Sequence, residues 1–174
     1  MTLATWLAVV SICILGAMSP GPSLALVLKQ TLTGGRGNGV ITALSHGLGV
    51  GIYAFLSILG LAAIITASPT AFAILQWGGA LYLAWLGMKG LMAKRQTNEE
   101  LPEPPTSRSA ARDGFLIAFF NPKIAVFFLA LFSQVVGTDT SLLAKFGYAA
   151  TALVIDTSWY VIVAWLFSNP RWLT

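Results

Sequence analysis

Long apolar stretches separated by short polar connections occupy most of the chain. A run of about 18 or more apolar residues is long enough to cross a bilayer as an α-helix. Five such runs cover residues 3–28, 40–67, 70–92, 114–136 and 142–168. We therefore predict an all-α integral membrane protein with five transmembrane helices.

Proline-centred polar motifs interrupt two of these runs. They are Ser19-Pro20-Gly21-Pro22-Ser23 in the first run and Asn121-Pro122-Lys123 in the fourth. A proline cannot continue a regular helix, and a helix broken at membrane depth must face protein or a water-filled cavity. Paired interruptions in corresponding segments of two halves indicate the substrate site of a transporter. We predict that these eight residues bind substrate; a structural hinge and a simple proline kink are the alternatives.

The connections predict how the chain is divided. The Ser68-Pro69 turn predicts a tight hairpin between the second and third helices. Residues 94–113 are rich in proline, serine and charge, which predicts a flexible linker. It would join a first three-helix repeat, residues 1–93, to a second repeat, residues 114–174, which holds only two helices. This pattern predicts a three-plus-three inverted-repeat fold that stops before its sixth helix.

Composition and charge support the membrane class. Apolar residues make up 56% of the chain and charged residues 9%, against roughly a quarter charged in soluble proteins. The net charge of +4 does not indicate a nucleic-acid partner, because the basic residues lie at the ends of apolar runs. One side of the predicted bundle collects Lys29, Arg36, Lys89, Lys94, Arg95, Arg108, Arg112 and Arg171, and the other only Lys145. This asymmetry places the linker in the cytoplasm and the N-terminus outside.

Three ionisable residues lie inside the predicted helices, where an unpaired charge is costly and a functional role is the default hypothesis. Burial favours the protonated form of a carboxyl group, so Asp156 suits the uptake and release of protons; a purely structural carboxylate is the alternative. Histidine changes charge near neutral pH, so His46 is a second proton-coupling candidate or a hydrogen-bonded structural residue. Lys123 pairs with Asp156, binds a substrate carboxylate, or extends to the cytoplasmic interface.

Two glycine-rich segments have different interpretations. Residues 34–39 lack the lysine and hydroxyl residue of a phosphate-binding loop and predict a flexible connection. The second segment is a stripe of small residues at every fourth position, formed by Gly39, Ala43, Gly47 and Gly51. Such a stripe suits close packing of helices within the chain or between two copies in a homodimer.

No motif for a cofactor, metal or nucleotide is present. Cys13 is the only cysteine and His46 the only histidine, which leaves too few ligands for a metal site and makes export of metal ions a weak alternative. An intramembrane enzyme would need a nucleophile with a base, or a metal cluster, and the sequence has neither. We therefore predict a transporter rather than an enzyme.

Several motifs together resemble the LysE/RhtB family of amino-acid exporters over nearly the whole chain. They are the two broken motifs, the Gly47/Gly49/Gly51 region, residues 79–87, Gly114-Phe115, Phe127-Phe128, and Asp156 with Trp159. The resemblance implies a multi-pass protein of the bacterial inner membrane that exports amino acids or close derivatives, such as homoserine, threonine, leucine or lysine. It also implies energy from the proton motive force, as in proton antiport. The expected partners are an amino acid, protons and the lipid bilayer.

The chain departs from that family in two ways. The first motif often ends in asparagine in the family, and Ser23 stands there in this chain, which bears on substrate preference. Family members also usually have one more hydrophobic segment after the fifth. An inactive or assembly-only membrane fragment is therefore the alternative to an active exporter.

Overall fold

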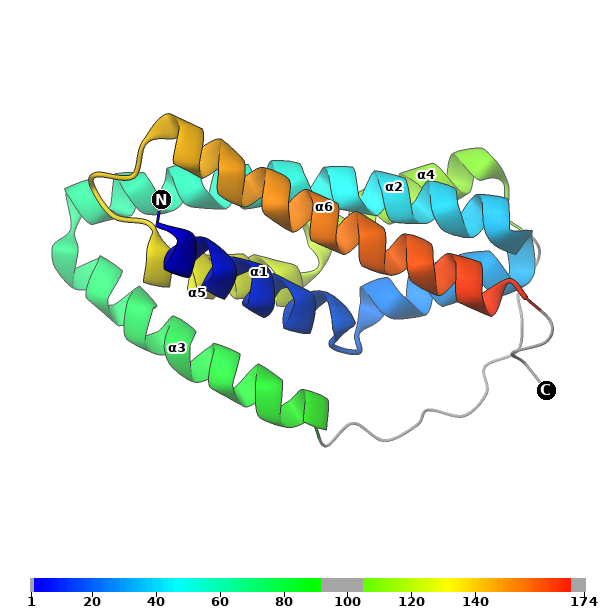
Figure 1. Cartoon of the computed structure of the whole chain (residues 1–174), viewed down its shortest axis with the longest axis horizontal. Coiled ribbons are helices and arrows are strands. Elements are labelled where there is room, and N and C mark those ends of the chain that lie inside the picture. The colour runs from blue at the N-terminus through cyan, green and yellow to red at the C-terminus, as the bar shows by residue number, and fades with distance from the viewer. Residues whose placement is uncertain (1, 92–104, 170–174) are drawn as a thin grey trace.

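The computed structural model describes residues 2–91 and 105–169 of the chain. Every regular element in these two ranges is an α-helix, which confirms the predicted all-α class. The helices are α1 (Leu3–Met18), α2 (Pro22–Ala67), α3 (Pro69–Leu91), α4 (Ser107–Phe120), α5 (Pro122–Val135) and α6 (Leu142–Phe167). The helices α2 and α6 lie side by side along the long axis, and α3 forms an outer edge (Figure 1).

The longest helix, α2, is a helical hairpin whose arms meet at Gly35. This residue has φ of 78° and ψ of 176°, which is not helical. Glycine adopts a positive φ without the steric cost that a Cβ atom imposes. Figure 1 shows the first arm, residues 22–34, reversing direction at this point into the second arm, residues 36–67.

Contacts between the two arms follow an antiparallel order. The close pairs are Ser23 with His46 through a hydrogen bond, Thr31 with Gly39 through close packing, and Val27 with Ala43 within one apolar cluster. The sequence numbers of each pair add up to nearly the same value, as they must in a hairpin. Residues in the first arm therefore face specific partners in the second.

The prediction that residues 34–39 form a flexible connection is wrong. Only Gly35 leaves the helix there, and the side chains around it are held by distant parts of the chain. The Arg36 Nε atom donates to the Ser168 hydroxyl at 2.8 Å, and the guanidinium lies 5.5 Å from the Trp165 ring centroid. The Asn38 amide donates to the Pro105 carbonyl at 2.6 Å. Glycine-rich composition indicated flexibility, but these tertiary contacts fix the turn.

The predicted linker, residues 94–113, is too long at its C-terminal end. Helix α4 begins at Ser107, because Thr106 caps it by accepting a hydrogen bond from the Ser109 amide at 3.1 Å. The Ser107 hydroxyl also donates to the Asn38 Oδ1 atom at 3.1 Å. Residues 107–113 are therefore helical, while the part of the predicted linker at 94–104 lies outside the described residues.

The two proline motifs break their helices as predicted. The first break separates α1 from α2 at residues 19–21, and the second separates α4 from α5 at Asn121 with a bend of 53°. The short connection at Ser68 likewise confirms the predicted hairpin between the second and third helices.

The stripe of small residues on α2 packs against α6. A Cβ atom on Gly47 would collide with the Thr157 side chain, and one on Gly51 would lie 2.6 Å from the Leu153 side chain. On another face of the same arm, a Cβ atom on Gly49 would lie 2.7 Å from Ala118 of α4. Because α6 covers Gly47 and Gly51, these two residues serve packing within the chain, the first of the two alternatives for the stripe.

Long apolar helices make the chain suited to a membrane. Within the described residues, α6 and the stretch Pro22–Leu61 of α2 are long and apolar enough to cross a bilayer, and the bent pair α4 and α5 adds a third span if counted as one. Many large apolar side chains are exposed, for example Leu143 at 83% and Trp77 at 75%. In a bilayer such side chains face lipid, where their exposure costs nothing.

We predict that Gly47→Ala destabilises the folded protein, because the added methyl group forces α2 and α6 apart. Overpacking of this kind costs about 1–3 kcal/mol. Thermal unfolding in detergent micelles measures the effect. The matched control is Gly60→Ala, also in α2, where a Cβ atom meets nothing within 4 Å. The control should be neutral or slightly stabilising, since alanine is the better helix former. An equal loss of stability in both variants would contradict the packing role of Gly47.

Candidate substrate site

Each proline motif ends one helix and begins the next. The residue before a proline avoids the helical conformation, and a proline at the first helical position loses no hydrogen bond. Pro22 and Pro122 hold this first position in α2 and α5. Gly21 precedes α2 without a side chain to bind its first amides, whereas Asn121 caps α5 by accepting from the Lys123 amide at 3.0 Å. Both breaks therefore present a helix N-terminus.

The two breaks lie against each other although about 100 residues separate them. The Lys123 ammonium donates to the Ser19 carbonyl at 2.7 Å and to the Pro20 carbonyl at 3.4 Å. The Asn121 amide donates to the Ser23 hydroxyl at 3.2 Å. The end of a helix carries partial negative charge on its free carbonyls, so the ammonium stabilises the end of α1. Each motif thus supplies hydrogen-bond partners to the other.

His46 links the first break to α6. Its Nδ1 atom lies 2.7 Å from the Asp156 Oδ2 atom, and its Nε2 atom lies 2.9 Å from the Ser23 hydroxyl. All three residues are buried, with His46 fully enclosed. The Tyr160 ring packs edge-on against the imidazole, with ring centroids 5.1 Å apart. The predicted proton-coupling residues thus form one pair in direct contact with a predicted substrate residue.

The hydrogen-bond network assigns a direction to each bond. An ionised carboxylate only accepts, so a neutral His46 donates from Nδ1 to Asp156 and accepts at Nε2 from the Ser23 hydroxyl. The Ser23 oxygen then accepts from Asn121, whose own carbonyl oxygen accepts from the Lys123 amide. In this state every hydrogen bond in the series from Lys123 to Asp156 has one donor and one acceptor.

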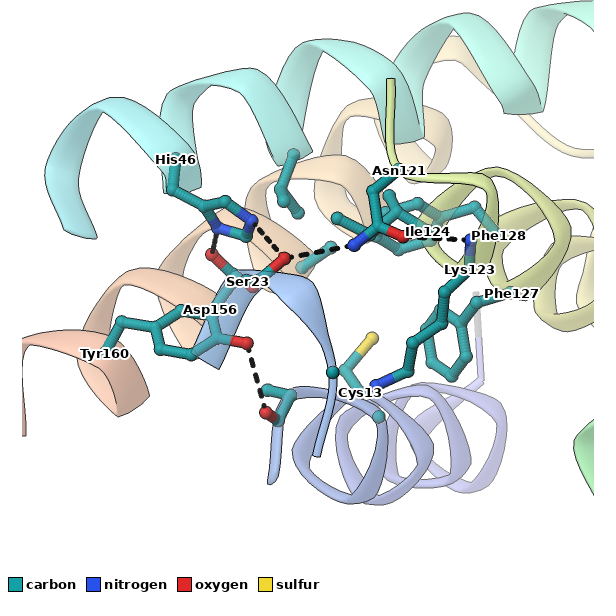
Figure 2. A pocket seen from close by; sticks show the side chains of 15 residues that line it. Cys13, Ser23, His46, Asn121, Lys123, Ile124, Phe127, Phe128, Asp156 and Tyr160 are labelled. Carbon is teal, nitrogen blue, oxygen red and sulfur yellow. Dashed lines mark hydrogen bonds and ion pairs between the residues drawn. The ribbon is translucent and has the colours of Figure 1, made fainter. Parts of the chain in front are cut away.

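A small cavity of about 40 Å³ lies where these residues converge. It has room for a few water molecules, since a cavity that holds one water has a volume of about 10–15 Å³. Figure 2 shows Asp156, His46 and Tyr160 on one side, Lys123 and Asn121 on the other, and Ser23 between them. The cavity therefore has an acidic side and a cationic side.

The structure divides the predicted site residues into two groups. Those that line the cavity are Gly21, Ser23, His46, Asn121, Lys123 and Asp156. Ser19 reaches the cavity's edge through its carbonyl, while the side chains of Pro20, Pro22 and Pro122 are exposed. The prolines shape the breaks and do not face the cavity. The ion pair of Asp156 is formed with His46, and the Lys123 ammonium contacts the carbonyls of the first break.

The cavity lining also holds residues that the sequence did not single out as site residues, among them Tyr160, Phe127 and Cys13. Tyr160 follows Asp156 by four positions on α6, and Phe127 follows Lys123 by four positions on α5. Residues four apart share a helix face, so this spacing was the available clue. Cys13, on α1, had no such partner in the sequence and is placed at the cavity only by the packing of α1.

The polar groups around the cavity suit a small zwitterion better than a metal ion. In the ranges 2–91 and 105–169, no group of three or more histidine, cysteine or acidic side chains lies close enough to hold a metal. The Asp156 carboxylate and the Lys123 ammonium line one cavity instead, which matches the two charges of a free amino acid.

Comparison with known proteins identifies relatives of this chain. The family described as LysE type translocator matches residues 14–173. The threonine efflux protein of Escherichia coli K12 is 29% identical over 97% of this chain and 84% of its own length. The threonine efflux protein of Salmonella typhi is 29% identical over 91% of this chain and 79% of its own length. An uncharacterized membrane protein of Escherichia coli K12, YahN, is 28% identical over 92% of this chain and 74% of its own length. No solved structure matches the chain.

We predict that Ser23→Ala destabilises the fold, because it leaves His46 Nε2 and the Asn121 amide without their shared partner. Leaving buried polar groups unsatisfied costs about 1–3 kcal/mol. Thermal unfolding in detergent is the measurement. Ser11→Ala is the control, since the Ser11 hydroxyl is exposed and bonds only the Leu7 carbonyl of its own helix. A Ser23→Ala protein as stable as the control would show that the network contributes nothing to stability.

Proposed function

The chain belongs to the LysE type translocator family, and on that premise we propose that it exports a small amino acid, with threonine as the first candidate. The observation that carries this proposal is the pair of opposite charges, Asp156 and Lys123, on two sides of one buried cavity. The names of two relatives, both threonine efflux proteins, point to the same substrate.

In the proposed binding mode the substrate carboxylate reaches Lys123. The ammonium of Lys123 lies at the first break, and the helix dipoles of α2 and α5 add partial positive charge at their N-termini. A carboxylate arriving there replaces the Ser19 and Pro20 carbonyls as the partner of the ammonium. The substrate ammonium then binds Asp156 on the opposite side.

Proton coupling follows from the charge of the His46–Asp156 pair. With a neutral imidazole the pair carries one negative charge and attracts the substrate ammonium. A proton added to the pair cancels this charge, so the attraction is lost. Proton and substrate therefore exclude each other, which is the condition for antiport. Protonation also turns Nε2 into a donor toward Ser23, whose hydroxyl hydrogen must then turn away from His46.

The proposed architecture has five spans in two halves, residues 1–93 and 114–174, related as inverted repeats. In the first half a broken span, α1 with the first arm of α2, precedes the unbroken second arm; in the second half the broken pair α4 and α5 precedes α6. This shared order supports the repeat. The excess of basic residues on one side supports a cytoplasmic linker, and the bacterial relatives support the inner membrane.

We predict that vesicles containing this protein release labelled threonine when a pH gradient is imposed, and that Asp156→Asn abolishes the gradient-dependent part. The amide keeps the shape of the side chain but can carry neither the proton nor the charge. Asp139→Asn is the control, because Asp139 is exposed in the loop before α6. Efflux unaffected by Asp156→Asn would remove the pair from the coupling step. Inserted protein that releases no amino acid would instead support a non-transporting fragment.

We predict that Lys123→Ala raises the KM for threonine about 10- to 100-fold, as expected for the loss of a charge-assisted hydrogen bond of about 1.5–3 kcal/mol. Initial efflux rates at several internal threonine concentrations measure this. The matched control is Lys145→Ala, a lysine of α6 that does not line the cavity. An unchanged KM in the Lys123 variant would rule out this residue as the carboxylate partner.

A further inference from the structure

Much of the rest of the cavity lining is apolar. Its apolar residues come from four helices and include Cys13, Val50, Ile124, Phe127, Phe128 and Ala152. If the substrate's carboxylate and ammonium occupy the two charged sides, its side chain has this apolar wall as its surroundings. The wall, and not the charged groups, then distinguishes one amino acid from another.

Phe127 occupies the position on this wall nearest in helix register to the carboxylate site. It lies one turn after Lys123 on α5, and Figure 2 shows its ring beside the Lys123 side chain. A substrate carboxylate held by Lys123 therefore places the rest of the substrate close to this ring.

The Phe127 ring is fixed in place by its neighbours. On one side it contacts the backbone of α1 at Gly16, where a Cβ atom would lie only 2.5 Å from the Phe127 Cζ atom. On the other side it packs edge-on against Phe128, with ring centroids 5.4 Å apart, and Phe128 stacks on Phe132. These contacts restrain the ring on both sides, so it opposes a larger substrate side chain placed against it.

The charges of the cavity limit the substrate further. Asp156 is the acidic residue of the cavity lining, and it is already the partner of the substrate ammonium in the proposed function. The other acidic residues in the described ranges, Asp113 and Asp139, lie outside the lining. A second positive charge on a substrate side chain would be buried against apolar groups without a partner, which is costly.

We propose that Phe127, seated against Gly16, is a specificity-determining residue that restricts the exporter to amino acids with short, uncharged side chains. This inference rests on the proposed function, because it assigns the side-chain pocket of the same site. It narrows the substrate from amino acids in general to those of about the size of threonine, and it excludes lysine-like substrates.

The test compares efflux of leucine with efflux of threonine from vesicles that contain the full chain. Phe127→Ala removes the ring, and Phe127→Leu replaces it with a smaller aliphatic side chain. We expect the ratio of leucine to threonine efflux to rise about 10-fold or more in Phe127→Ala, in line with the discrimination that a hydrophobic pocket provides. Because the readout is a ratio for one preparation, it does not depend on how much protein is inserted.

Phe132→Ala is the matched control. Phe132 lies on the same helix, is fully buried and stacks in the same aromatic row, but it does not line the cavity. The ratio of leucine to threonine efflux in Phe132→Ala should stay at the wild-type value. Equal changes in the Phe127 and Phe132 variants would overturn the inference, since general loosening of α5 would then explain both.

The remaining outcomes separate this inference from the proposed function. A wild-type protein that exports threonine, with a ratio unchanged in Phe127→Ala, would overturn the role of Phe127 and leave the exporter intact. If Phe127→Ala does not fold, an unchanged ratio in the milder Phe127→Leu variant overturns it in the same way. A wild-type protein that exports neither amino acid overturns the proposed function, and the inference falls with it.

Discussion

The fold depends on how the backbone groups freed by two broken helices find partners at membrane depth. Each proline motif removes helical hydrogen bonds, and no water is available in hydrocarbon to replace them. The partners come from the opposite break: Lys123 binds the Ser19 and Pro20 carbonyls, and Asn121 binds Ser23. Each break therefore takes part of its hydrogen bonding from the other half of the chain. These bonds hold the two halves together at the breaks.

The helices around the breaks are arranged so that these contacts can form. The hairpin at Gly35 returns the chain so that Ser23 meets His46, and the small residues of α2 let α6 approach until Asp156 reaches the imidazole. The close helix packing and the polar network are thus one feature, because a wider spacing between α2 and α6 would separate the buried ion pair. A carboxylate left alone in this position would be strongly disfavoured.

The sequence predicted the local features of this structure and missed the long-range ones, for a physical reason. Prolines act on their own turn, so the breaks at Pro22 and Pro122 follow from sequence alone. The pairing of Asp156 with His46 joins residues 110 positions apart and depends on how whole helices pack. The same limit explains the error at residues 34–39. Their glycines indicate conformational freedom, yet Arg36 and Asn38 are anchored by Ser168 and Pro105, which are distant in the sequence.

The groups that close the cavity are also the groups proposed to bind the substrate. The cavity of about 40 Å³ has room for only a few water molecules, so in the proposed binding mode the two breaks separate to admit an amino acid. Separation costs the bonds from Lys123 to the Ser19 and Pro20 carbonyls, and an arriving carboxylate offers the same ammonium a stronger, charged partner. In the proposed binding mode, substrate binding therefore offsets the cost of opening. A ligand without a carboxylate would leave the breaks closed, so in this mode the contact between the breaks both gates the cavity and selects the substrate.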